Sequence, residues 1–368
     1  MKFQVALTSL LAAAAVASPV EDLFKHKAKK SSTSSAHPSS TTKGKPTSSA
    51  HAKALPSSLA SLLANTTGNA SNMTNSTVAP QKQQLQVIYT GGQVAIPSTN
   101  ATNTTAFSTN STALFNTTSA LNITELYSVA ATINQTLADN STKGAVVVAN
   151  AKSLESLGFL TSIVLDSKKP IVISADEKMA LAVANETAAW NRGPLVVSKE
   201  GLVYAGIFTP SSANAVGLPV AVIDDAKKVQ WFFSPAPPAL INSNSTIRVN
   251  YTNFTNTDIE FAATPLVPIV YDGGYSSSLI SSLASTVQGL VVVSSGSSNS
   301  TTSTIESAQI PVVYANSGAP LTPVSSKDVP QNALSAGYLT PVKAQLLLSI
   351  AAINGVNSDE ALMSIFPN

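Results

Sequence analysis

The chain has 368 residues, of which 44% are hydrophobic and 11% are charged, so it holds enough apolar material for one large or two medium domains. Its 21 basic and 19 acidic residues give a formal net charge of +2, which excludes the strongly basic surface of a nucleic-acid-binding protein. The absence of cysteine excludes disulfides, thiolate nucleophiles and zinc–thiolate centres.

Residues 1–18 have the pattern of a secretory signal peptide. Lys2 supplies the positive charge, an apolar run follows at 5–16, and the small residues that cleavage requires are Ala15, Ala17 and Ser18. Because this run is too short to cross a bilayer, we expect no transmembrane segment. Further on, Lys29 and Lys30 form a candidate dibasic processing site, with a solvated basic run as the alternative.

Residues 19–84 are rich in Ser and Thr, and they have too few apolar side chains to form a core. We expect a disordered, glycosylated propeptide or stalk. Sixteen N-x-[ST] sequons occur in the chain, and this density behind a signal peptide predicts a secreted glycoprotein, extracellular or in the cell wall. The candidate glycosylation sites are Asn65, Asn69, Asn72, Asn75, Asn100, Asn103, Asn110, Asn116, Asn122, Asn134, Asn140, Asn185, Asn244, Asn250, Asn253 and Asn299.

From residue 85 onward, apolar runs alternate with helical stretches. Continuous β-branched runs predict strands buried on both faces of a parallel sheet, at 85–89, 144–149, 169–174, 193–198, 218–223, 266–271, 288–294 and 310–315. Crossover helices are predicted at 123–137, 153–165, 176–190 and 277–287. This alternation indicates an α/β fold.

The last helix has the clearest start signal, because Thr340 is a good N-cap and Pro341 suits the first helical position. Its apolar side chains at helical spacing are Val342, Leu346, Ile350 and Ile353. Residues 234–264 are rich in proline and sequons, so we take them as a linker. It would join a larger N-terminal domain, 85–233, to a smaller C-terminal α/β domain, 265–368.

The residue types limit the chemistry that the folded part can perform. The three histidines, His26, His37 and His51, lie in the tail or stalk, so we expect no histidine-based triad, no metal site and no cofactor. Hydroxyl chemistry remains, supported by backbone N–H groups at glycine turns. The turn 90–92, Thr-Gly-Gly, follows the first strand, where ligands bind in such sheets; the alternative is a tight turn without a ligand.

Five segments resemble those of a known family, in the family's order. "VIYTGGQVA" (87–95) resembles the first signature of the bacterial-type (type II) L-asparaginase/glutaminase family, and "GAVVVANAKSLESLGFL" (144–160) resembles its second. The other segments are "KKPIVISAD" (168–176), "NRGPLVV" (191–197) and "SAGYLTPVKAQLLLSIAA" (335–352). The resemblance implies a two-domain fold, with a larger, mostly parallel N-terminal sheet flanked by helices and a smaller C-terminal α/β domain. It also implies a possible homo-oligomer.

The family's catalytic groups are not matched in this sequence. The resemblance places Gln93 where the family has its threonine nucleophile, and a carboxamide cannot form an acyl-enzyme. It places Ala151 and Lys152 at the family's Thr-Asp pair. Ala151 has no hydroxyl, and Lys152 would repel the ammonium group of an amino-acid substrate. The chain is therefore identified as a degenerate, secreted member of fungal type.

A vestigial pocket would consist of Thr90, Gly91, Gly92 and Ser119, the last or a neighbour being at the family's substrate-binding serine. Gln93 is either a plain turn residue or a side chain that occupies the old pocket as a substrate mimic. A structure with Gln93 directed into solvent would exclude the mimic. Lys152 is either a solvated residue at a helix start or a group that opposes substrate binding.

Three functions remain open at this point. The first is a secreted or wall glycoprotein with an asparaginase-like fold and no hydrolase activity, binding wall polysaccharide or an amino-acid-like ligand. The second is an active amidohydrolase that converts L-asparagine to L-aspartate and ammonia with a rearranged site. The third is a structural wall mannoprotein in which the fold is only a scaffold.

Overall fold

The computed structural model describes residues 84–91, 109–211, 217–257, 265–272, 277–294, 309–316 and 321–367. All of them belong to the second of the two units into which the chain divides, Met1–Asn75 and Ser76–Asn368. The predicted signal peptide and nearly all of the predicted stalk lie outside the described residues, as do Gly92, Gln93, Asn65, Asn69, Asn72, Asn75, Asn100, Asn103 and Asn299.

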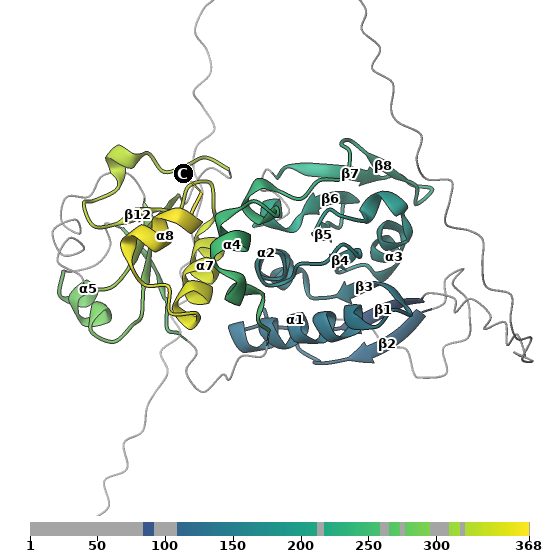
Figure 1. The fold of residues 1–368 in the computed structure, drawn as a ribbon, viewed down its shortest axis with the longest axis horizontal. Helices are drawn as coiled ribbons and strands as arrows, with labels where there is room; N and C mark the ends of the chain where they lie inside the picture. Colours follow the sequence, from purple (N-terminus) through teal and green to yellow (C-terminus); the bar gives the residue numbers. More distant parts are fainter. Residues whose placement is uncertain are drawn as a thin grey trace, which may run out of the picture. The chain divides into compact units, whose positions relative to one another are not determined.

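The larger sheet has eight strands in the order β2-β1-β3-β4-β5-β6-β7-β8 (Figure 1). Pairing is parallel from β2 through β5 and antiparallel from β5 through β8. The strands are β1 (Gln84–Tyr89), β2 (Thr109–Ala113), β3 (Thr142–Val148), β4 (Ile171–Ser174), β5 (Pro194–Val197), β6 (Leu202–Ala205), β7 (Pro219–Ile223) and β8 (Val229–Trp231).

Helices cover both faces of this sheet, because alternate strand residues point to opposite sides. Ile88 of β1 packs in one cluster with α1 (Ile123–Ala138) and α2 (Leu154–Val164). Val87 and Tyr89 pack in another with α3 (Glu177–Asn185). Short 3-10 turns, η1 (Ala151–Ser153), η2 (Thr187–Ala189) and η3 (Gly206–Phe208), connect these elements.

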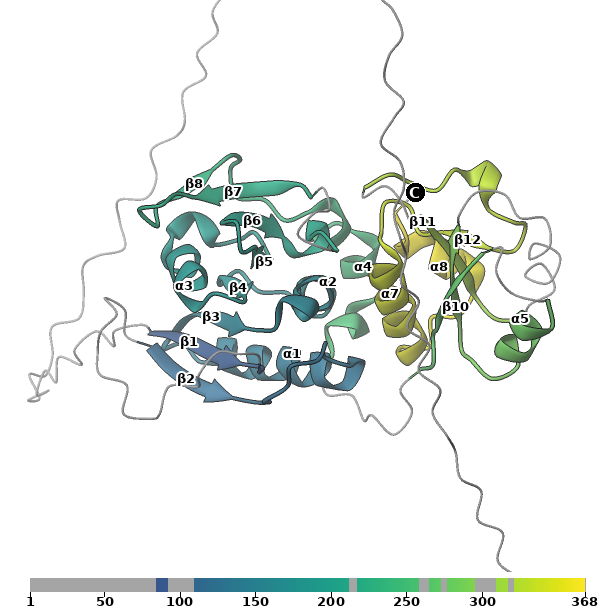
Figure 2. The ribbon, with the colours of Figure 1, turned by 180° about the vertical axis from the view of Figure 1, so that it is seen from behind.

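The smaller sheet is entirely parallel, with the order β12-β11-β10-β9 (Figure 2). Its strands are β9 (Ile269–Tyr271), β10 (Leu290–Ser294), β11 (Val312–Asn316) and β12 (Leu334–Ser335). The helices are α5 (Ser277–Ala284), α7 (Pro341–Ile353) and α8 (Asp359–Ile365), and η7 (Ser326–Asp328) precedes β12. Thr340 caps α7 as predicted, since its hydroxyl accepts a hydrogen bond from the Lys343 N–H at 3.3 Å.

These elements confirm the predicted α/β class, with a large, mostly parallel sheet and a second, small parallel sheet. The eight predicted strands and five predicted helices are all present, but the prediction that 218–223 is a parallel strand is wrong. This strand, β7, is antiparallel to β6 and β8. A tight turn at Gly201 (φ 79°) reverses the chain between β5 and β6, and a turn at Lys227 (φ 64°) reverses it between β7 and β8. Strands β2, β6, β8 and β12 and helices α4 and α8 were not predicted.

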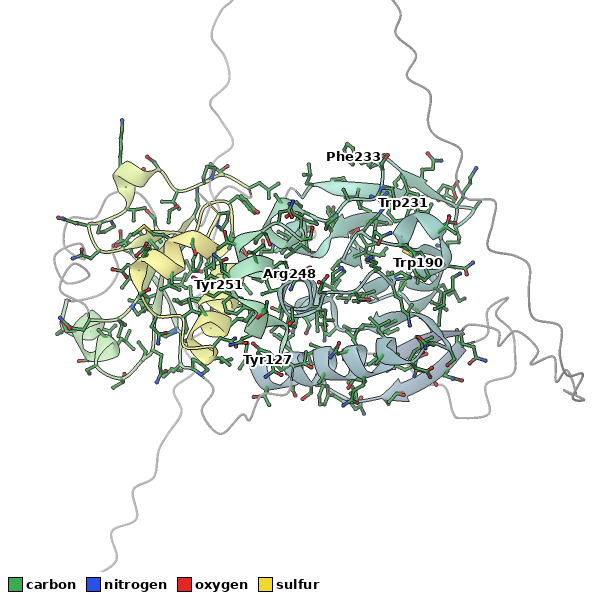
Figure 3. The ribbon with its side chains drawn as sticks, viewed as in Figure 1. Tyr127, Trp190, Trp231, Phe233, Arg248 and Tyr251 are labelled. Carbon is green, nitrogen blue, oxygen red and sulfur yellow. The ribbon has the colours of Figure 1, made fainter. Side chains whose placement is uncertain are left out.

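Residues 234–257, within the stretch taken as a linker, form η4 (Ala239–Ile241), α4 (Thr246–Asn250) and η5 (Thr252–Thr255). Ile247 and Phe254 are buried in the main hydrophobic core. Arg248 donates hydrogen bonds to the carbonyls of Ser162, Ile163 and Leu165 at 2.7, 2.7 and 2.9 Å (Figure 3). Its guanidinium thus satisfies the last carbonyls of α2, which have no partner within the helix.

A buried ionic pair joins α2 to α7. The Lys343 ammonium lies 4.0 Å from the Glu155 carboxylate and donates to the Thr209 carbonyl at 2.6 Å, and the Thr340 hydroxyl donates to Glu155 at 2.6 Å. Burial raises the pKa of Glu155 and lowers the pKa of Lys343 to about 8. Each charge is therefore retained inside the protein mainly through the other and its hydrogen bonds.

We predict that Lys343→Met lowers the free energy of unfolding by about 3–5 kcal/mol, because it leaves the Glu155 carboxylate buried without a cation. The double variant Glu155→Gln/Lys343→Met should recover most of this loss, since it removes both charges. Urea unfolding of the four proteins of this double-mutant cycle measures the coupling. A loss in the double variant equal to the sum of the losses in the two single variants would show that the two charges do not depend on each other.

The lowered pKa of Lys343 predicts that the free energy of unfolding depends on pH. This pKa is about 8 in the folded protein against 10.5 ordinarily, so between these values the unfolded chain holds a proton that the folded chain has released. The unfolding free energy of the native protein relative to that of Lys343→Met should therefore rise with pH across this window. Denaturant titrations from about pH 7 to about pH 10 test the sign. Lys178→Met, at an exposed lysine of α3, is the control and should show no such trend.

Candidate functional site

The candidate site lies at the carboxyl edge of β1 and β3, where the parallel register pairs Tyr89 with Val148. Thr90 follows β1 and is only 1% exposed. Both its N–H and its hydroxyl donate to the Val148 carbonyl, at 3.0 and 3.3 Å. Thr90 therefore fastens the end of β1 to β3, and its hydroxyl is neither accessible nor placed beside a base.

Gly91 makes the turn that the sequence predicts, with φ of 94°. A β-carbon at this position would lie 2.2 Å from the Thr117 backbone nitrogen and 2.7 Å from its carbonyl oxygen. Only glycine permits this approach, so the segment 116–119 packs directly against the turn. The Thr117 backbone therefore lies against the turn at which the resemblance implies a substrate pocket.

Asn150 and Ser153, in the segment that resembles the family's second signature, form side-chain hydrogen bonds to Thr118 and Leu121, at and just after the segment that packs on Gly91. The Asn150 side chain donates from Nδ2 to the Thr118 carbonyl at 2.7 Å, and its Oδ1 accepts from the Lys152 N–H at 3.0 Å. The Ser153 hydroxyl accepts from the Leu121 N–H at 3.0 Å. Sequence analysis missed Asn150 and Ser153 as functional positions; an asparagine just before a helix start was the available signal.

Ala151 and Lys152 are exposed at the start of η1, beside this hydrogen-bonded network. Ser119 is also exposed, and its N–H donates to the Thr117 hydroxyl at 3.1 Å. The structure therefore brings Thr90, Gly91 and the residues around Ser119 and Ala151 to one edge of the sheet. Gln93 and Gly92, the remaining predicted positions, lie outside the described residues.

The hydroxyls at the neighbouring strand ends have structural partners. Ser174, at the end of β4, donates to the Val197 carbonyl at 3.1 Å and accepts from the Asp176 N–H at 3.0 Å. Tyr89 donates to Glu177 at 2.9 Å on the α3 side of the sheet. Within the described ranges, no group of three or more histidine, aspartate or glutamate side chains could hold a metal ion. Among the described residues, these hydroxyls connect elements of the fold.

The candidate glycan acceptors are favourably placed. In the part of the chain that the structure describes, every sequon asparagine is exposed: Asn110, Asn116, Asn122, Asn134, Asn140, Asn185, Asn244, Asn250 and Asn253. Asn122 also caps α1, accepting from the Glu125 N–H at 2.9 Å through Oδ1, which leaves Nδ2 available for a glycan. No helix among the described residues is long and apolar enough to cross a membrane.

We predict that Gly91→Ala destabilises the protein through two effects, the left-handed backbone and the contact with Thr117. Gly355→Ala is the matched control, because Gly355 also has positive φ (73°) but no atom lies within 4 Å of an added β-carbon. The Gly91 variant should lose about 1–3 kcal/mol more than the control, the usual effect of overpacking. Chemical denaturation measures both, and equal losses would contradict the close packing of 116–119.

Two yeast proteins are similar to this chain over most of its length. The chain is 54% identical to Protein YGP1 of Saccharomyces cerevisiae over 373 residues, covering 100% of both chains. It is 44% identical to the sporulation-specific wall maturation protein of the same yeast over 302 residues, 77% of this chain and 89% of that protein.

A more distant likeness extends to an enzyme. L-asparaginase 2-3 of Saccharomyces cerevisiae is 25% identical over 282 residues, 67% of this chain and 74% of that protein. No family model matches the chain. From the two closer similarities and the fold, the chain belongs to the asparaginase-like family that includes Protein YGP1 and the sporulation-specific wall maturation protein.

Proposed function

We propose that this protein is a secreted glycoprotein of the cell wall or its surroundings, which keeps the asparaginase-like fold but does not hydrolyse asparagine or glutamine. The observation that carries the proposal is the pair Ala151 and Lys152, exposed at the start of η1. Where the resemblance implies a threonine and an aspartate, this chain has a methyl group and a cation. The cation would repel a substrate's ammonium group.

The surroundings of Thr90 and Gly91 also support the proposal. Residues 116–119 pack on Gly91, and Asn150 and Ser153 hold the segment by hydrogen bonds. An amidohydrolase of this kind needs an accessible hydroxyl beside a base at this edge. Thr90 is buried and donates to Val148, so it is a poor substitute for the nucleophile.

Secretion and wall association rest on the sequons and on the relatives. Nine described sequon asparagines are exposed, as glycan acceptors must be in the folded protein. One relative is named a sporulation-specific wall maturation protein. We propose the corresponding organisation for this chain: a signal peptide at 1–18, a glycosylated stalk at 19–84, and asparaginase-like domains at 85–233 and 265–368 joined by 234–264. The finer assignment to the bacterial-type (type II) branch rests on the five resembling segments.

The test is ammonia release from millimolar L-asparagine and L-glutamine by the purified secreted protein. We expect no turnover above the rate without protein. The variant Gln93→Thr/Ala151→Thr/Lys152→Asp restores the family's groups, and calorimetry with L-asparagine then shows whether binding returns. Lys178→Asp is the control, with the same charge change at an exposed lysine of α3.

Turnover by the native protein would contradict the proposal and support the active amidohydrolase instead. Binding restored only in the triple variant would show that a pocket survives and that the lost groups alone abolish recognition. If neither the native protein nor the triple variant shows turnover or binding, and the protein is released from walls only by glucanase, the result would favour a purely structural wall component.

A further inference from the structure

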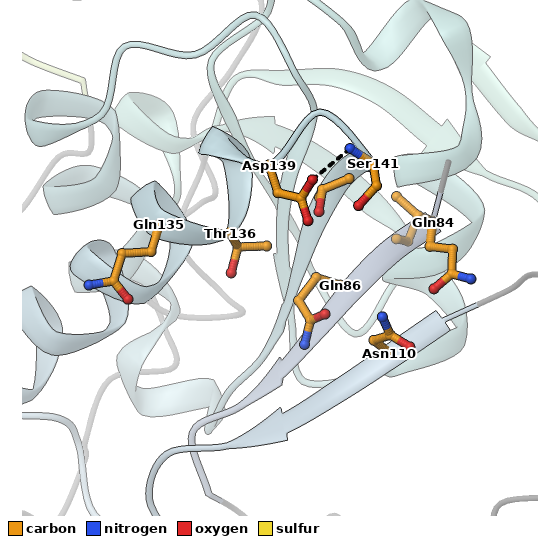
Figure 4. A pocket seen from close by; sticks show the side chains of 9 residues that line it. Gln84, Gln86, Asn110, Gln135, Thr136, Asp139 and Ser141 are labelled. Carbon is orange, nitrogen blue, oxygen red and sulfur yellow. Dashed lines mark hydrogen bonds between the residues drawn. The ribbon is translucent and has the colours of Figure 1, made fainter. Parts of the chain in front are cut away.

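A polar cavity of about 300 Å³ lies at the amino ends of β1 and β3, the opposite edge of the sheet from the candidate site (Figure 4). Its size is at the lower limit of small-molecule sites, which begin at roughly 300 Å³. The first residues of β1 and β3, the strand β2 and the last turn of α1 surround it. The lining residues are Gln84, Leu85, Gln86, Asn110, Gln135, Thr136, Asp139, Ser141 and Thr142.

Asn110 lines this cavity and is also the acceptor of a sequon. The parallel register places Asn110 directly beside Gln86, so the two side chains lie on the same face of the sheet. The Gln86 side chain donates to the hydroxyl of Thr112, the third residue of the sequon, at 3.0 Å. The amide nitrogen to which a glycan is attached therefore belongs to the wall of the cavity.

The polarity of the cavity departs from the rest of this sheet face. Ile88, further along β1 on the same side, is fully buried with α1 in the main core. Gln84 and Gln86 occupy the equivalent positions at the cavity, and Gln135 of α1 is a further lining residue. Such inward positions in a helix-covered parallel sheet are normally apolar.

The groups that converge here favour a neutral ligand with hydroxyl and amide groups. Glutamine and asparagine side chains both donate and accept hydrogen bonds. Hydrogen bonding from the Ser141 backbone, at 2.8 Å, lowers the pKa of Asp139, so its carboxylate remains an acceptor. The ammonium of Lys169, which is not among the lining residues, donates instead to the carbonyls of Leu137 and Asp139, both at 2.8 Å. This chemistry matches an N-acetylhexosamine.

We propose that the cavity binds the first sugar residues of an N-linked glycan attached to Asn110. This inference rests on the proposed function, because it requires that the protein is a glycoprotein. The attached sugar is favoured as occupant because its attachment atom is already at the cavity, which removes the loss of translational freedom that a free saccharide would suffer. The docked glycan would also cover β2, the strand at one end of the larger sheet, against pairing with another chain.

The test combines glycan mapping with thermal unfolding of the secreted protein. Mass spectrometry measures occupancy at Asn110. Asn110→Gln and Thr112→Ala each remove the sequon, Thr112→Ser keeps both sequon and hydroxyl, and Asn244→Gln removes another exposed sequon as control. We expect the first two to lower Tm by about 2–4 °C, the shift from one good polar contact in a domain of this size. The other two should leave Tm nearly unchanged.

A double-mutant cycle tests the docking itself. Gln135→Ala keeps the Asn134 sequon and should lower Tm in the glycosylated protein but not in the Asn110→Gln background. Gln230→Ala, at an exposed glutamine of β8, should be without effect in both. Trimming the glycans to a single N-acetylglucosamine should preserve the coupling, because the first sugars make the contacts.

Four results would overturn the inference. Additive losses for Gln135→Ala and Asn110→Gln would show that the glycan and the cavity do not interact. An unmodified Asn110 in a protein glycosylated elsewhere would remove the occupant while leaving the proposed function intact; absence of glycan from every sequon would remove both. Binding of free N,N′-diacetylchitobiose to Asn110→Gln, without coupling in the glycosylated protein, would assign the cavity to a free saccharide.

Discussion

The parallel pairing of β1 with β3 positions both the candidate site and the polar cavity. It pairs Tyr89 with Val148, so the Thr90–Gly91 turn and the Asn150–Ser153 motif meet at one edge. At the other edge the register shifts between Gln84 and Leu85, so that Gln84 pairs with Thr142, and the cavity lies beside these two residues. Because side chains alternate along β1, Gln84, Gln86 and Ile88 share one face, on which Ile88 packs in the core and the two glutamines line the cavity. Strand β1 thus contributes Ile88 to the core, ends at the edge with the candidate site, and contributes Gln84 and Gln86 to the polar cavity.

A different interaction, a buried ionic pair, connects α2, which covers the large sheet, to α7. Glu155 and Lys343 are buried together, and the partners that surround them come from separate elements: Thr340 caps α7, and Thr209 follows η3. A buried pair of this kind adds little net stability over an apolar contact, but it penalises any arrangement that separates the charges. The pair therefore specifies how α2 meets α7, and Arg248 adds a second polar connection at the end of α2.

The strongly apolar elements could be predicted from sequence, and the polar ones could not. Buried strands such as β3 and β10, and α7 with its Thr340 cap and Pro341, carry patterns that reflect their burial and local geometry. Strand β2, with the sequence TNSTA, is an exposed edge strand without an apolar signal; only its pairing with β1 makes it a strand. The antiparallel β7 has the apolar run of a parallel strand, because direction depends on turns and not on hydrophobicity. The covering of Gly91 by Thr117 depends on a contact across 26 residues, which no local pattern records.

Three positions that match the family's segments make contacts within the fold, whereas two positions that depart from it are exposed. Thr90, Gly91 and Lys343 match, and each makes a contact within the fold: a hydrogen bond to Val148, a close approach to Thr117, an ionic pair with Glu155. Ala151 and Lys152 depart from the family, and both are exposed. Substitutions at exposed positions usually change stability by less than about 0.5 kcal/mol, whereas loss of a buried network is far more damaging. Substitutions such as those at Ala151 and Lys152 therefore cost the scaffold little, whereas the positions with buried partners remain constrained by the fold.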